Sequence, residues 1–288
     1  MTVAALLARA NQALARSDAA LLQGDLDAMH DALVEVLDTF AELTAQGETL
    51  RNETLAPPPW DEAEVTRALW LVLAQLKRAG CGAFPFAGTL LGLERDGRLL
   101  ANDDDADLAV WLEDFSLACR TLEAIGFMRA TNVPPFGNVA TFVLREPSLS
   151  LDLFGIRREP EQQRLVGGTW LYGRPPSHQR IVHYPWFELV SRPGPAGDVW
   201  WPKPPDALLR ALYGDWRTPQ PEWDSLVSCR ALQDTNLQWR CWSYKRLSDQ
   251  WRSGDLQRTR GLLEQILARA PGDPQLLAWR HVLDAAAA

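Results

Sequence analysis

The fold of this chain is decided by two neighbouring segments, GTLLGLER at residues 88–95 and DDDAD at residues 103–107, which stand seven residues apart. The first follows an apolar segment, 83–87, which predicts a strand that ends just before a short helix over 89–95. The second opens the segment 105–111, which is apolar after its aspartates and predicts another strand. Strands and helices continue to alternate after this point and predict an α+β domain.

The two segments place phosphate-binding and metal-binding groups close together. Gly88 and Thr89 stand at the predicted start of a helix, where backbone N–H groups and a hydroxyl can receive phosphate oxygens. Residues two apart on a strand face the same side, so Asp105 and Asp107 present two carboxylates together. Such oxygen ligands suit Mg²⁺ or Mn²⁺, which neutralise charge on a phosphate during transfer. The pattern predicts a phosphoryl-transfer site, although aspartates at this density also fit a solvated turn.

A third carboxylate comes from a later segment. Residues 148–156 alternate in a strand-like way, with apolar Leu149, Leu151 and Leu153 enclosing Asp152 and with no Lys or Arg between them. An aspartate in such a strand is costly unless it is paired. We therefore predict that Asp152 completes an acidic triad across two strands, either as a metal ligand or as the group that accepts a proton.

The spacing G-T-L-L-G-x-x-R-x₇-D-D-D-x-D resembles the signature of the LicD family, which is related to fukutin and fukutin-related protein within the nucleotidyltransferase-fold superfamily. LDLF at 151–154 resembles the later acidic strand of that family, and the stretch from Trp201-Pro202 through Leu209 to Tyr213-Gly214-Asp215-Trp216 resembles its closing segment. The chain departs at Ala101 and Asn102, where the family usually has Pro-Trp. The resemblance covers residues 61–225 and implies a nucleotidyltransferase-like mixed sheet with helices.

The resemblance implies a metal-dependent transferase that moves a phospho-alcohol group, such as phosphocholine or a polyol phosphate, from a CDP-linked donor to a glycan hydroxyl, releasing CMP. It assigns metal binding and catalysis to Asp105, Asp107 and Asp152, and donor binding to Gly88, Thr89, Gly92 and Arg95. Arg95 would contact phosphate or tie its loop to an aspartate. Two alternatives stay open. One is a nucleotidyltransferase that moves NMP from an NTP to a small acceptor with release of pyrophosphate. The other is a catalytically idle module that recruits a glycosyltransferase.

The two ends of the chain differ from its middle. We expect an acidic helical hairpin over 1–50, a proline-rich linker over 51–60, the catalytic domain over 61–228 and a helical segment over 229–288. Gly24-Asp25-Leu26 and Gly254-Asp255-Leu256 each stand at a bend between amphipathic helices, so both ends resemble tetratricopeptide-like helix pairs. The first end is acidic and the last is basic, which predicts that they pack together. Their surfaces also offer a site for a protein partner.

Composition excludes several classes of protein. A net charge of −8 argues against a nucleic-acid-binding protein. The four cysteines, Cys81, Cys119, Cys229 and Cys241, lie far apart and have no histidine at ligand spacing, so we expect reduced thiols in the core. No apolar run reaches the length of a membrane span and the start has no secretory pattern, so a cytoplasmic protein without an integral membrane segment is expected.

Overall fold

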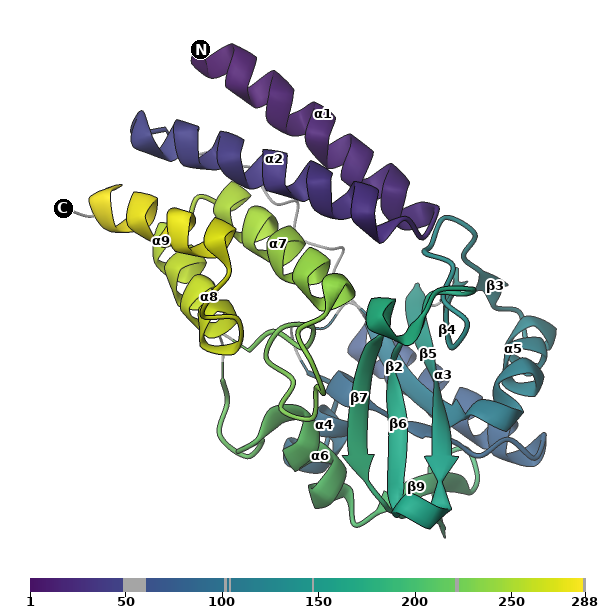
Figure 1. Ribbon diagram of the computed structural model, residues 1–288. Coiled ribbons are helices and arrows are strands. Elements are labelled where there is room, and N and C mark those ends of the chain that lie inside the picture. Colours follow the sequence, from purple (N-terminus) through teal and green to yellow (C-terminus); the bar gives the residue numbers. More distant parts are fainter. Residues whose placement is uncertain (49–60, 101–102, 104, 147, 221–222, 287–288) are drawn as a thin grey trace.

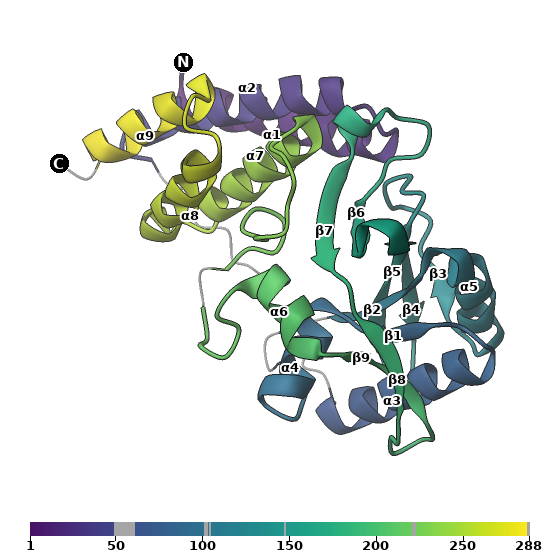
Figure 2. The same ribbon diagram turned by 60° about the horizontal axis from the view of Figure 1, so that its bottom comes forward.

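The computed structural model describes residues 1–48, 61–100, 103, 105–146, 148–220 and 223–286. Helices and a mixed sheet of parallel and antiparallel strands make an α+β protein, as predicted. The sheet lies on one side of the molecule with the helices of residues 62–213 around it, whereas the helices from both ends of the chain gather on the other side (Figures 1 and 2). The predicted linker, 51–60, falls outside the described residues.

The sheet has two connected parts. Its strands are β1 (Ala83–Pro85), β2 (Asp105–Trp111), β3 (Met128–Arg129), β4 (Val139–Leu144), β5 (Leu149–Glu159), β6 (Arg164–Thr169) and β7 (Arg180–Pro185). The first five lie in the order β1-β2-β5-β4-β3, while the last residues of β5 pair with β6, which pairs with β7. Within this sheet, the β2–β5 pair is parallel and the other strand pairs are antiparallel.

The central strands are held by burial. The predicted alternation in β5 is observed, since Leu149, Leu151 and Leu153 are fully buried. Helices α3 (Glu62–Arg78) and α5 (Phe115–Ala124) pack together and contact β1 and β2, respectively. A separate hairpin of β8 (Glu188–Arg192) and β9 (Val199–Lys203) packs on α3 through β9. Two short helices, α4 (Ala87–Arg95) and α6 (Pro205–Tyr213), contact each other beside β2.

The two ends of the chain form one helical unit, which consists of α1 (Val3–Leu22), α2 (Leu26–Ala45), α7 (Leu237–Arg252), α8 (Leu256–Arg269) and α9 (Pro274–Ala286). Asp25 and Asp255 cap α2 and α8 in the same way, because each side chain accepts a hydrogen bond from the N–H three residues later. Gly24 and Gly254 precede them with φ of +67° and +79°, which closes the preceding helix. The expected bends therefore form at both ends.

The predicted packing between the two ends is observed, but its main contacts are aromatic and apolar. The rings of Phe40 in α2 and Trp251 in α7 are stacked, with their centroids 3.9 Å apart. Trp251 Nε1 donates a hydrogen bond to Thr44 Oγ1 at 2.8 Å. Trp279 of α9 donates to the carbonyl of Leu37 at 2.6 Å. The charge difference adds an ion pair at the edge, between Lys245 Nζ and Asp18 Oδ1 at 4.0 Å. Burial of large rings holds the two ends together.

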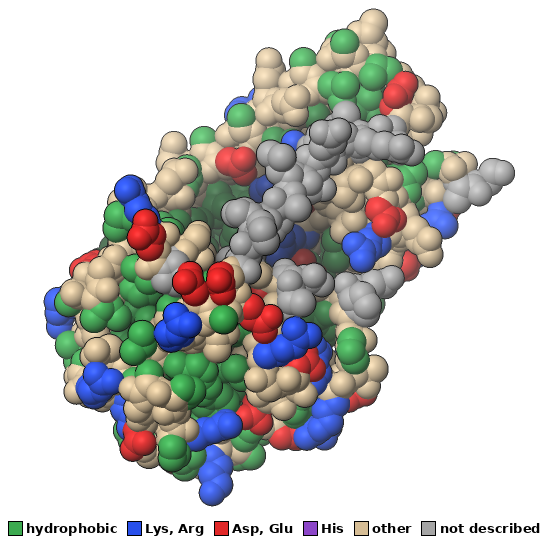
Figure 3. Space-filling view, turned by 180° about the vertical axis from the view of Figure 1, so that it is seen from behind, with side chains coloured by type: hydrophobic (Ala, Val, Ile, Leu, Met, Phe, Trp, Pro, Cys, Tyr) green, Lys and Arg blue, Asp and Glu red, His purple; other side chains and the backbone are tan. Residues whose placement is uncertain are grey.

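Two surface features bear on the excluded classes. On the face shown in Figure 3, basic and acidic side chains are interspersed among the described residues. No helix in the described part of the chain combines the length and apolar character needed to cross a bilayer.

All four cysteines are buried and free, as predicted.

We predict that Phe40→Ala lowers the free energy of unfolding by about 3–5 kcal/mol, because it removes a fully buried ring from the contact between the two ends. Urea denaturation measures this change. Leu22→Ala is the control, since Leu22 is 39% exposed and its truncation is expected to cost under about 1 kcal/mol. Equal effects of the two substitutions would contradict the packing described.

Candidate functional site

The two central parallel strands bring three carboxylates together. Asp105 and Asp107 lie on one face of β2, and Asp107 stands directly beside Asp152 in the register between β2 and β5. One oxygen from each carboxylate lies within 4.8 Å of the others, and all three residues are half-buried. The structure therefore assembles the acidic triad, defined as Asp105, Asp107 and Asp152, from two separate parts of the sequence.

The triad suits a hard divalent cation. Mg²⁺ binds oxygens at about 2.1 Å, so two of its ligands lie at most about 4.2 Å apart, a spacing that small side-chain rotations would reach from the observed one. Three carboxylates in one cluster repel each other, and a divalent ion would relieve that repulsion. All the donors are oxygens, which favours Mg²⁺ or Mn²⁺ over metals that prefer nitrogen or sulfur.

Neighbouring groups hold two of the carboxylates in place. The N–H of Gly88 donates to Asp107 Oδ2 at 3.0 Å. The hydroxyl of Thr141 in β4 donates to Asp152 Oδ1 at 2.6 Å, and these two residues are paired in register between β4 and β5. Among the described residues, no group donates a hydrogen bond to the second oxygen of Asp107 or of Asp152. One contact therefore orients each carboxylate.

Burial and mutual repulsion raise the pKa of the inner carboxylates. The pKa of Asp107 is well above its ordinary value, first because of burial and then because of the charges of Asp105 and Asp152. Burial also raises the pKa of Asp152, and its hydrogen bond from Thr141 offsets part of that effect. Such shifts in a cleft are typical of functional acids and of metal ligands seen without their ion.

The glycines of the first motif let the chain approach closely. A Cβ added at Gly88 would lie 2.7 Å from Asp103 Oδ2, so glycine lets the start of α4 approach the carboxylates without displacing that side chain. A Cβ at Gly92 would lie 2.6 Å from the carbonyl oxygen of Arg98. Because glycine has no Cβ, α4 can pack against the loop that follows it. Ala87, just before Gly88, has a φ of +39°, a strained value that places backbone tension beside the triad.

Thr89 and Arg95 make contacts that define their places. Thr89 is fully buried, and its Oγ1 accepts the N–H of Asp107 at 2.8 Å, so it fixes β2 against α4. Arg95 lines the cleft described below and forms a two-pronged pair with Asp96, with Nε to Oδ1 at 3.0 Å and Nη2 to Oδ2 at 2.9 Å. Of the two roles predicted for Arg95, the tie to an aspartate is observed.

The triad opens into a cleft of about 1030 Å³. Its lining combines residues from β2, β5, α4, α6, the segment after α6 and α7. Trp216, which belongs to the closing segment identified in the sequence, lines the cleft as well. Several other lining residues are not expected at a site from the sequence, namely Thr141, Trp223, Trp242 and Arg246. Tyr213 also lines the cleft, and its signal in the sequence is the Tyr-Gly pair of the closing segment.

Comparison with known proteins adds no assignment. No protein-family model matches the chain, and no curated protein shows significant sequence similarity to it. The candidate site therefore rests on the residues and their geometry.

The raised pKa of Asp152 predicts a pH-dependent stability in protein treated with EDTA. Above its ordinary value of 3.8, the unfolded chain has lost this proton while the folded protein still holds it. Stability from this group is therefore fully present below pH 3.8 and is lost as the pH rises through the folded-state pKa. Asp152→Asn removes the ionisable group, so the stability no longer falls as the pH rises, and the amide keeps an oxygen acceptor for Thr141. We expect a higher melting temperature than wild type at pH 7, with the difference shrinking toward pH 4.

Differential scanning calorimetry across this pH range measures the effect. Asp31→Asn is the control, since its side chain is 87% exposed and lies on α2 away from the cleft. The same pH trend in both variants, or a lower melting temperature for Asp152→Asn at pH 7, would contradict the raised pKa.

Proposed function

We propose that this protein is a divalent-metal-dependent transferase that moves a phospho-alcohol group from a CDP-linked donor to a glycan hydroxyl. The observation that carries the proposal is the acidic triad in the lining of a cleft of about 1030 Å³, which is large enough for a nucleotide diphosphate and part of an acceptor. The resemblance of the two motifs to the LicD family supplies the substrate class.

The reaction forms one bond and breaks another at a single phosphorus. The oxygen of an acceptor hydroxyl bonds to the phosphorus that carries the alcohol, and the bond from that phosphorus to the bridging oxygen of the diphosphate breaks. CMP leaves with the electron pair of that bond. The hydroxyl proton passes to a carboxylate, and we assign this role to Asp152, which belongs to the triad and is oriented by the hydroxyl of Thr141.

Divalent ions, when bound, supply positive charge to the diphosphate and to its leaving oxygen. The chain would hold such an ion with Asp105 and Asp107, and with Asp152 when it is not acting as the base. Asp103 lines the same cleft and adds a fourth carboxylate nearby. This surplus of negative charge explains why the site needs a cation before it can accept a diphosphate.

The groups around the triad divide between binding and positioning. We assign the N–H groups at the start of α4, beginning at Gly88, to the donor phosphates, together with the cleft-lining cations Arg95 and Arg98. Thr89 is a positioning residue, since its hydroxyl accepts the N–H of Asp107 and is buried. Gly92 serves close packing at the back of α4.

Product identity tests the proposal. CDP-choline, CDP-ribitol and CDP-glycerol are incubated with the protein, Mg²⁺ or Mn²⁺ and glycan acceptors, and ³¹P NMR follows the products. We expect CMP and a phosphodiester on the acceptor. Release of pyrophosphate from an NTP, with no CMP from any CDP-alcohol, would instead establish nucleotidyl transfer. No turnover with either donor class would contradict both and leave the binding-module alternative.

We predict that Asp107→Asn lowers kcat/KM by about 1,000-fold, because loss of a metal-binding carboxylate removes several kcal/mol of charge stabilisation and each 1.4 kcal/mol is about tenfold in rate. Steady-state release of CMP measures this. Asp31→Asn is the matched control and keeps wild-type activity. A rate for Asp107→Asn within about threefold of wild type would show that the triad is not the catalytic site.

A further inference from the structure

The cleft has a second wall that the proposed chemistry does not use. Trp242 and Arg246 of α7 line the same cleft as the triad. They belong to the helical unit, which the sequence predicts to be a scaffold or partner surface. The catalytic cleft is therefore built partly from the C-terminal helices.

A continuous line of side chains leads from the triad to this wall. Tyr213 lines the cleft together with Asp103 and Asp107. Burial and then the charges of Asp107 and Asp103 raise the pKa of its hydroxyl. The ring of Trp223 lies next, with its centroid 5.5 Å from that of Tyr213 at an interplanar angle of 50°. Asp224 follows in the chain and forms an ion pair with Arg246.

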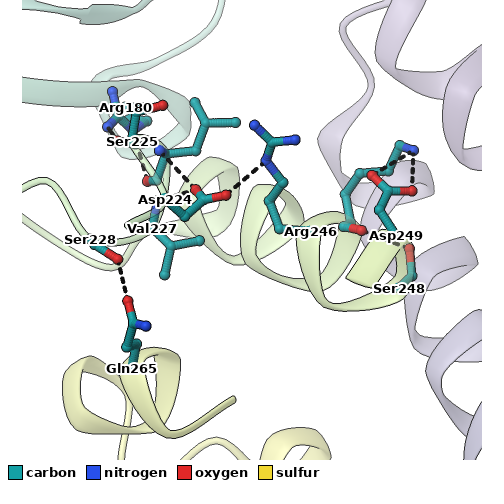
Figure 4. Close-up of polar contacts among 11 residues, drawn as sticks. Arg180, Asp224, Ser225, Val227, Ser228, Arg246, Ser248, Asp249 and Gln265 are labelled. Carbon is teal, nitrogen blue, oxygen red and sulfur yellow. Dashed lines mark hydrogen bonds and ion pairs between the residues drawn. The ribbon is translucent and has the colours of Figure 1, made fainter. Parts of the chain in front are cut away.

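The segment that carries Asp224 is braced on several sides (Figure 4). Asp224 Oδ1 accepts the N–H groups of Leu226 and Val227, each at 3.0 Å. The guanidinium of Arg180, a buried residue of β7, donates to the carbonyl of Ser225 at 2.8 Å. These contacts fix Asp224, so the side chain of Arg246 is oriented by a rigid partner.

Arg246 uses only one edge of its guanidinium in this pair. Nε lies 3.0 Å from Asp224 Oδ2, and Figure 4 shows the two terminal nitrogens pointing away from Asp224. The side chain is 44% exposed. A planar guanidinium held in this way presents its outer edge for a two-pronged contact with a carboxylate or phosphate group.

The position of α7 relative to the sheet is also fixed. Gln238, in the first turn of α7, is fully buried and accepts the N–H of Arg180. Its Nε2 donates to Thr169 Oγ1 in β6 at 3.0 Å. This polar anchor places Trp242 and Arg246, one and two turns later, on the cleft.

Two of the three cleft-lining indoles, Trp223 and Trp242, keep a hydrogen-bonding capacity, whereas Nε1 of Trp216 donates to Asp206. Among the described residues, the Nε1 atoms of Trp223 and Trp242 are shielded and have no acceptor. A shielded N–H without an acceptor costs free energy, which a ligand oxygen recovers when the ring turns toward the cleft. Indole rings that offer a face and an N–H, beside a guanidinium, match a sugar ring that carries a negative charge.

We propose that Trp223, Trp242 and Arg246 form a subsite for an anionic sugar, with Arg246 binding its carboxylate or phosphate group. The assignment of this sugar as the acceptor rests on the proposed function. It places the acceptor on the α7 side of the cleft and the donor diphosphate on the triad side. The C-terminal helices then determine acceptor specificity.

Sugar binding without donor or metal tests the subsite. In EDTA, glucuronate, glucose 6-phosphate and glucose are titrated separately into the full-length protein and followed by saturation-transfer NMR. We expect at least one anionic sugar to bind about tenfold more tightly than glucose, as a charged two-pronged contact allows. Glucuronate and glucose 6-phosphate distinguish a carboxylate source from a phosphate source.

Arg246→Gln is expected to abolish this preference while leaving glucose binding unchanged. Arg258→Gln is the matched control, because Arg258 lies on α8 with 58% exposure and does not line the cleft. If Arg246→Gln does not fold, Arg246→Lys replaces it and should lower the preference about fivefold, since an ammonium cannot make the two-pronged contact. No preference in wild type, or an unchanged preference in the Arg246 variant, would overturn the proposal.

The transfer assay separates this subsite from the proposed function. With an anionic glycan acceptor, Arg246→Gln should raise the acceptor KM about tenfold and leave the KM of the CDP-linked donor unchanged. An increase in the donor KM instead would overturn the placement on the acceptor side. Anionic sugars that bind through Arg246 in a protein without CDP-alcohol turnover would uphold the subsite and refute the proposed reaction.

Discussion

The repulsion among three carboxylates on adjacent strands is the constraint on which the site depends. Parallel pairing sets Asp107 directly beside Asp152, and Asp105 adds a third charge on the same face. Buried like charges are expensive, and the raised pKa values of Asp107 and Asp152 express that cost. The strands that carry these charges are held by buried neighbours such as Leu151 and Leu153, which are fully shielded from solvent. In the proposed function, a divalent cation would convert this repulsion into binding energy.

The surrounding structure serves this cluster in two ways. Close packing of α4 against β2, made possible by Gly88 and by the buried hydroxyl of Thr89, sets the backbone next to the carboxylates. The helical unit then closes the cleft from the other side, held by aromatic burial between α2, α7 and α9. The chain ends are thus tied to the site through α7, whose anchor is Gln238.

Much of this arrangement is predictable from local sequence. The spacing of Asp105 and Asp107 on a strand, and the burial cost of Asp152 among leucines, identify the triad because both arguments need only the strand period. The partner Thr141 has no such signal, since its place depends on the register between β4 and β5. The local sequence likewise does not identify Arg246 and Trp242 as site residues, because only the packing of α7 against the rest of the chain brings them to the cleft.

The predicted end of β5 shows the same limit. The apolar alternation ends near residue 156, but the strand continues to Glu159 because its last residues pair with β6. Charged residues such as Arg157 and Glu159 carry no strand pattern, although their backbones complete the sheet. Hydrophobic periodicity therefore predicts buried strands well and strand extensions with exposed faces poorly.

Electron paramagnetic resonance of Mn²⁺ with the protein and CDP tests the central claim most directly. The triad predicts that Mn²⁺ becomes immobilised and shows hyperfine coupling to ³¹P of the nucleotide, and that Asp107→Asn abolishes both signals. A spectrum of free aqueous Mn²⁺ in the presence of excess protein, or coupling that persists in Asp107→Asn, would contradict a cation held by these carboxylates beside a diphosphate.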